Sequence, residues 1–153
     1  MKKILPLILL FYFILLCKPI LAQITLGTSP YVQNFDGIST GLPTGFTVRT
    51  GATATALGTA ATLTAIPGNS TTNWSNTGGG FRNYASANGL ISSTPVATQT
   101  VANDRALGVR QTGSLGDPGA AFVVQLANTN MRTGFSLSFQ LQSVDASSPR
   151  TTT

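Results

Sequence analysis

The chain has 153 residues, with nine Lys and Arg against four Asp, no His, one Cys and a net charge of +5. All three lysines and the cysteine lie in the first 18 residues, so the remainder carries six arginines against four aspartates, a net charge of +2. Without His, Cys, Lys or Glu, that remainder lacks the side chains for a Ser-His-Asp triad, a Cys-His pair, a Schiff base or a His-ligated zinc site. Its scattered arginines also do not form the basic stripe that nucleic-acid binding needs. We therefore expect neither an enzyme nor a nucleic-acid partner.

The first residues have the three parts of a secretory signal. Met1–Lys3 is positively charged, Ile4–Cys17 is apolar, and small Ala22 marks a cleavage site. A Lys-Pro pair interrupts the apolar run before it reaches the length of a membrane-spanning helix. The sequence predicts a cleavable signal helix at residues 1–22 and one exported domain at 23–153, secreted or on the cell surface, with no membrane contact after cleavage.

The first half of that domain alternates short strand patterns with turn residues. Tyr31–Phe35 is a predicted strand, ended by an Asp-Gly turn. Phe46–Arg49 is a second one, with apolar and polar residues on opposite faces. In Thr50–Ile66, Thr and Ala alternate at low complexity, which predicts one or two weak strands broken near Gly58.

The second half begins with the strongest loop pattern, Pro67–Gly80. Phe81–Ser86 and Arg105–Arg110 are predicted strands, and Thr94–Val101 is a weaker one. No segment after residue 22 has the pattern of an amphipathic helix. Turn residues recur at the spacing typical of an antiparallel sandwich.

The clearest pattern lies near the end of the chain. In Phe135–Gln142 every odd position is a large apolar residue and every even position is polar, the period of a half-buried strand. Ala120–Ala127 has a similar pattern, and a polar loop of residues 128–134 joins the two. We expect them to pair antiparallel and to form the centre of an all-β, antiparallel β-sandwich.

Four segments together resemble a known family: Tyr31–Gly37, Gly41–Phe46, Asp104–Gly108 and Ser138–Ser143. They resemble the N-terminal lectin-like or jelly-roll β-sandwich modules of secreted, multidomain Bacteroidetes-type proteins, whose chains commonly end in a type IX secretion sorting domain. The resemblance implies a fold and export. It implies no functional residues, because the matching positions are strand and turn residues.

Modules of this family continue into further strands after a segment like Ala146–Thr153. We therefore expect the domain to be incomplete at its C-terminus. The alternative is a complete chain with a disordered end.

The long loop and the strand after it supply the candidate ligand-binding residues. These are Asn73, Trp74, Asn76, Arg82 and Tyr84. Trp74 has polar neighbours in a loop, so we expect it to be exposed and to stack on a sugar ring, with the polar side chains as hydrogen-bonding groups. Phe81 opens a strand and is expected in the core.

The aspartates are candidates for a structural Ca²⁺ site, because calcium takes carboxylate and carbonyl oxygens that sandwich loops can supply. The candidate ligands are Asp36, Asp104 and Asp145. No contiguous Asp-x-Asp loop is present. The alternative is that each aspartate only forms a turn.

These observations predict a non-catalytic, exported module for extracellular binding or adhesion, with a glycan or another cell-surface component as partner. Two alternatives remain open. The chain is the N-terminal ancillary part of a larger secreted enzyme, or it is a structural spacer.

Overall fold

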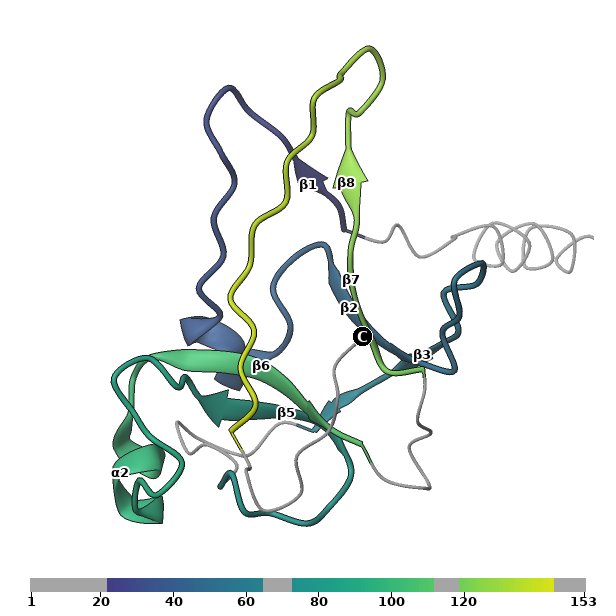
Figure 1. The fold of residues 1–153 in the computed structure, drawn as a ribbon. Coiled ribbons are helices and arrows are strands. Elements are labelled where there is room, and N and C mark those ends of the chain that lie inside the picture. The colour runs from purple at the N-terminus through teal and green to yellow at the C-terminus, as the bar shows by residue number, and fades with distance from the viewer. Residues whose placement is uncertain (1–21, 65–72, 112–118, 145–153) are drawn as a thin grey trace, which may run out of the picture.

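The computed structural model describes residues 22–64, 73–111 and 119–144 (Figure 1). The expected signal helix and the end of the chain lie outside these residues, except for Ala22. The strands are β1 (Ile24–Thr25), β2 (Phe46–Thr50), β3 (Thr59–Ala61), β4 (Leu63–Thr64), β5 (Gly80–Ala85), β6 (Arg105–Arg110), β7 (Ala121–Val124) and β8 (Leu126–Ala127), with a 3₁₀-helix η1 at Asp36–Thr40 and an α-helix α2 at Val96–Val101. The fold of the described residues is β-rich.

One three-stranded sheet has the order β3-β2-β7, with β2 antiparallel to both neighbours. Val48 of β2 pairs with Ala61 and Phe122 and is fully buried. The predicted strand at Phe46–Arg49 is thereby confirmed. Of the one or two weak strands predicted within Thr50–Ile66, the described residues form β3 and β4, both after Gly58, and residues 51–57 form only the isolated bridge between Thr53 and Ala56. Gly58 has a φ of 69°, which a residue with a side chain rarely adopts, and this explains the break before β3.

The second three-stranded sheet has the order β4-β5-β6. β5 and β6 pair antiparallel along their whole length, whereas β4 runs parallel to β5. Phe81 of β5 is buried, as expected from its position. Its ring meets the ring of Phe122 edge to face, with centroids 5.7 Å apart, and this contact joins the two sheets.

The smallest sheet is the parallel pair β1-β8. Gln125 separates β7 from β8, and its backbone accepts a hydrogen bond from Ile24 and donates one to Gly45. The predicted strand Ala120–Ala127 is therefore confirmed in position. Its partners are β2, which pairs with β7, and β1, which pairs with β8, in place of the predicted partner Phe135–Gln142. The parallel pairs also depart from the expected purely antiparallel arrangement.

The prediction for Phe135–Gln142 is wrong. The segment forms no strand, and Figure 1 shows it as a yellow-green chain without an arrow. All its side chains are exposed, and its backbone makes no hydrogen bond to the backbone of another described residue. Alternation fits a sheet, but a strand also needs a partner at hydrogen-bonding distance.

Two other predicted strands are also absent. Tyr31–Phe35 is irregular and leads into η1, with Phe35 in the left-handed conformation at a φ of 63°. Thr94–Val101 instead contains α2, which follows Pro95. Proline fits the start of a helix because its fixed φ suits the first turn and its missing N–H has no partner there in any case.

Candidate functional site

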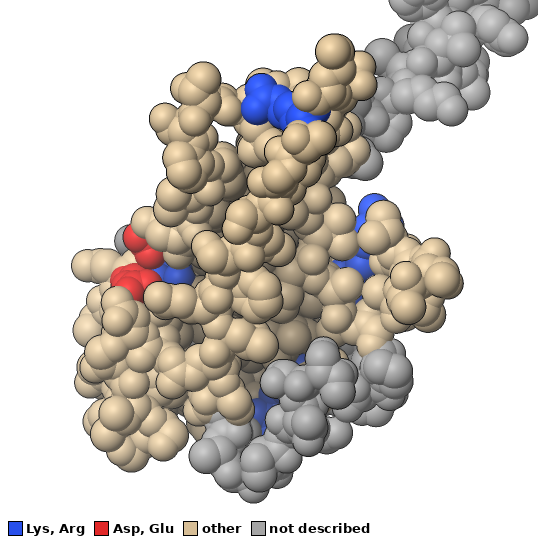
Figure 2. Space-filling view, turned by 45° about the horizontal axis from the view of Figure 1, so that its top comes forward, with Lys and Arg blue, Asp and Glu red and all other residues tan. Residues whose placement is uncertain are grey.

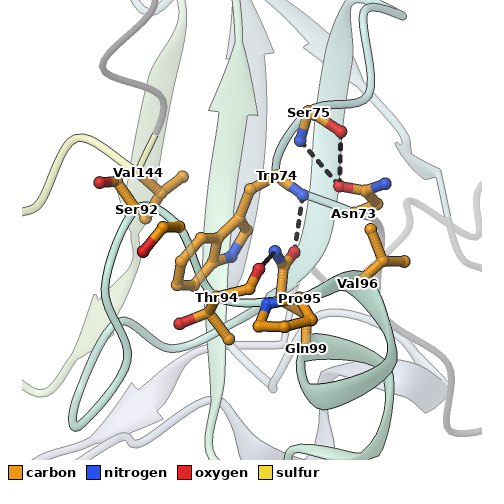
Figure 3. A pocket seen from close by; sticks show the side chains of 10 residues that line it. Asn73, Trp74, Ser75, Ser92, Thr94, Pro95, Val96, Gln99 and Val144 are labelled. Carbon is orange, nitrogen blue, oxygen red and sulfur yellow. Dashed lines mark hydrogen bonds between the residues drawn. The ribbon is translucent and has the colours of Figure 1, made fainter.

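A pocket of about 420 Å³ lies where α2 and the turn before it meet the Trp74 loop (Figure 3). Its lining residues are Asn73, Trp74, Ser75, Ser92, Ser93, Thr94, Pro95, Val96, Gln99 and Val144. A volume of this size accommodates a small ligand. Among the described lining residues none carries a charge, and most of them offer a hydroxyl or an amide.

Trp74 forms the inner part of this site. The expectation that it is exposed is wrong, because its side chain is only 4% exposed. Its indole Nε1 donates a hydrogen bond to the carbonyl oxygen of Ala85 at 3.1 Å, and its ring packs in a cluster with Tyr84 and Ala85. Trp74 therefore cannot offer a whole ring face for stacking.

Gln99 of α2 holds the Trp74 loop to the helix. Its side-chain oxygen accepts a hydrogen bond from the backbone N–H of Trp74 at 2.9 Å, and its side-chain nitrogen donates to the carbonyl of Thr94 at 2.8 Å. The Gln99 side chain is buried, and its bond to Trp74 is shielded from water, whereas its bond to Thr94 is partly buried. One amide thus connects three parts of the pocket wall (Figure 3).

The rim of the pocket is polar. The Asn73 side-chain oxygen accepts hydrogen bonds from the backbone N–H and the hydroxyl of Ser75, each at 2.8 Å. These bonds hold the turn that carries Trp74. Ser92 and Ser93 also line the pocket and are exposed. Their hydroxyls are able to donate and to accept hydrogen bonds to a ligand.

The structure brings only part of the predicted set together. Asn73 and Trp74 line the pocket, whereas Asn76, Arg82 and Tyr84 do not. Asn76 accepts from the N–H of Gly78, and Arg82 donates to the carbonyl of Gly79, so both act within the loop before β5. Tyr84 packs against Trp74 in the core. Burial raises the pKa of Tyr84, with Arg82 and Arg110 opposing that shift.

The acidic residues lie on another part of the surface. Figure 2 shows acidic side chains in red, close together on one face beside a basic side chain in blue, and the described residues contain two acidic ones, Asp36 and Asp104. Asp36 accepts hydrogen bonds from the Asn34 side chain and from the backbone N–H of Arg105, the latter at 3.0 Å. Asp104 accepts from the Asn88 side chain.

Asp36 and Asp104, two of the three expected calcium ligands, therefore already accept hydrogen bonds from protein groups. Burial lowers the pKa of Arg105, and the neighbouring Asp36 opposes that shift. The described residues contain no cluster of three acidic, His or Cys side chains that could hold a metal ion, and Asp145 lies outside them. Asp36 lies near the guanidinium of Arg105, and the calcium site stays a prediction.

Sequence reasoning missed the wall formed by Ser92–Val96, Gln99 and Val144. The residues of this wall lie far along the chain from Trp74, and their contacts depend on the tertiary fold. Of these residues, only the run of hydroxyl side chains before Pro95 could have indicated a binding surface from the local sequence.

Comparison with protein-family models, with curated proteins and with solved structures found no match to this chain. Within residues 22–64, 73–111 and 119–144, no helix has the length and apolar character needed to cross a membrane.

Proposed function

We propose that this chain is a non-catalytic β-sandwich module that is exported from the cell and binds a neutral, hydroxyl-rich ligand, of the carbohydrate class, in the Trp74 pocket. The observation that carries the proposal is the lining of this pocket, whose described residues combine hydroxyls and amides with an indole and carry no charge.

The ligand class follows from the chemistry of the wall. A charged ligand would lose its hydration without gaining an ion pair, which is costly. A neutral sugar, in contrast, exchanges hydrogen bonds to water for bonds to Ser92, Ser93 and Asn73. Trp74, although buried, lines the pocket with an apolar ring edge, and the partly buried Val144 adds an aliphatic contact for the C–H groups of the sugar.

The sandwich arrangement is supported by the Phe81–Phe122 contact between the two three-stranded sheets. Export is supported by the pattern of the first 22 residues, with a charged start, an apolar middle and a small residue before the cleavage point. The absence of His, Cys, Lys and Glu after residue 22 supports a binding role over a catalytic one.

The test is binding of the purified chain to a panel of immobilised neutral and charged oligosaccharides. We expect saturable binding to neutral members. A Ser92→Phe variant, in which the ring occupies the pocket, should bind at least about tenfold more weakly, a loss of about 1.4 kcal/mol.

Ser29→Phe is the matched control, because Ser29 is also an exposed serine and does not line the pocket. This variant should bind like the wild type. Binding that is confined to charged glycans, or that is equal in Ser92→Phe and the wild type, would contradict the proposal.

A further inference from the structure

The segment Phe135–Gln142 presents four large apolar side chains to solvent. Leu137 is 78% exposed and Phe139 is 74% exposed, and Phe135 and Leu141 are exposed as well. These four residues alternate with Ser and Gln, so an extended chain places all of them on one face. The backbone between them is also open, because it makes no hydrogen bond to the backbone of another described residue.

Both ends of this segment are attached to the rest of the molecule. At its start, Arg132 donates hydrogen bonds to the carbonyls of Leu26 and Gly27, and Asn128 donates to that of Leu26. At its end, Val144 packs against the Trp74 cluster. An extended segment held at two points has already lost much of its chain entropy, which lowers the cost of pairing with another strand.

The order of residues is self-complementary about Ser138. When two copies run antiparallel with Ser138 opposite Ser138, Phe135 faces Leu141 and Leu137 faces Phe139. Every apolar cross-strand pair is then Phe with Leu, on one face, and the polar residues pair on the other. No residue between 133 and 144 is charged, so no like charges face each other within the paired segments.

We propose that Phe135–Gln142 is a dimerisation strand, which pairs antiparallel with the same segment of a second copy of this chain about a two-fold axis at Ser138. The contact is isologous, because residue i of one copy meets residue 276 − i of the other, and it closes after two copies. Each strand supplies backbone partners that the other does not find among the described residues of the monomer.

The expected size of the contact sets its strength. The exposed parts of the four apolar side chains amount to on the order of 500 Å² per copy. This is less than the roughly 800 Å² per partner of a standard interface. The dimer should therefore be concentration-dependent, and sedimentation velocity over a wide concentration range should resolve monomer and dimer.

A cross-linking pair tests the register. In the proposed dimer the two Ser138 Cα atoms are about 4.5–5.5 Å apart, a distance that a disulfide spans. The two Ser136 Cα atoms lie four residues apart along the strands, roughly 14 Å, and a disulfide cannot join them. In a Cys17→Ser background, which removes the chain's own cysteine, Ser138→Cys should oxidise to a covalent dimer and Ser136→Cys should not.

A charge exchange tests the same contact by sedimentation. Leu137→Lys and Phe139→Asp, each alone, should weaken the dimer at least tenfold. When the two variants are mixed, the introduced lysine of one copy faces the introduced aspartate of the other, and the second pair remains Leu with Phe. The mixture should form a heterodimer. Val32→Lys, at an exposed apolar residue elsewhere, should dimerise like the wild type.

The remaining outcomes overturn the proposal. A chain that stays monomeric at all concentrations would show that something other than a second copy covers the segment. Open-ended aggregates would show that the contact does not close. Equal cross-linking at positions 136 and 138, or a dimer that Leu137→Lys leaves intact, would place the contact elsewhere.

Discussion

The ring of Tyr84 lies across the backbone of Gly108 on the neighbouring strand. β5 and β6 pair so that Tyr84 is directly opposite Ala106, which places Gly108 diagonally across from the tyrosine. A Cβ atom added to Gly108 would lie 2.7 Å from Cε2 of Tyr84 and closer still to Cδ2. This glycine is therefore required by close packing under the ring. Tyr84 in turn packs against Trp74, so the position of the ring affects the pocket.

Gly108→Ala should destabilise the fold by about 1–3 kcal/mol, because the added methyl group forces the buried Tyr84 ring to move. The measurement is the free energy of unfolding from urea denaturation. Gly37→Ala is the control, since a Cβ at that exposed glycine meets nothing within 4 Å. In a Tyr84→Leu background the cost of Gly108→Ala should shrink, and an unchanged cost would contradict the packing explanation.

Tyr84 should make stability depend on alkaline pH. Burial raises its pKa above the ordinary value of about 10, and the cations of Arg82 and Arg110 only partly offset this shift. Folding therefore favours the protonated phenol. Its contribution is fully present below the unfolded-state pKa and is lost as the pH rises through the folded-state pKa.

We expect urea unfolding of the wild type to show this loss of stability above about pH 10. Tyr84→Phe should reduce the loss, because the phenol that ionises is gone. Identical profiles for Tyr84→Phe and the wild type would contradict the assignment.

Gln99→Met should cost about 1–3 kcal/mol of stability, since the buried N–H of Trp74 and the carbonyl of Thr94 lose a hydrogen-bonding partner while the side-chain volume is kept. The measurement is again urea denaturation. The neighbouring Thr98→Val substitution on the exposed side of α2 should change stability little. If the two variants were equally stable, Gln99 would not be the link between the helix and the Trp74 loop.

Asn83→Leu should stabilise the protein by about 1 kcal/mol or more. Asn83 is fully buried on β5, and neither its side-chain oxygen nor its nitrogen has a hydrogen-bonding partner among the described residues. A leucine of similar shape removes this desolvation cost. Asn83→Asp, which buries a charge at the same site, should destabilise strongly. A large loss of stability in Asn83→Leu would show that the amide has a partner.

The strands that the sequence predicts correctly are those whose local pattern and long-range pairing agree. β2 alternates apolar and polar residues, β5 and β6 lie between turn-rich segments, and each of the three meets a neighbouring strand in register. Phe135–Gln142 has the strongest alternation in the chain and still forms no strand. Periodicity indicates which face of a segment could be buried, whereas strand pairing depends on the tertiary arrangement.

The pocket was only partly predictable for a similar reason. The polar neighbours of Trp74 indicated an exposed loop, yet Gln99 from 25 residues away closes over its backbone and Ala85 accepts its indole N–H. The helix that carries Gln99 has six residues, too few for a helical periodicity to be visible. Burial of a loop residue by a short distant helix leaves little trace in the local sequence.

The most direct test of the proposed function is the fluorescence of Trp74, the only tryptophan in the chain. Its buried indole should emit at short wavelength in the free protein. Titration with a neutral oligosaccharide should change this emission in a saturable way, and the change should be absent in Ser92→Phe. An emission that stays constant across neutral glycans, or that responds equally in Ser92→Phe, would contradict the assignment of this pocket as the binding site.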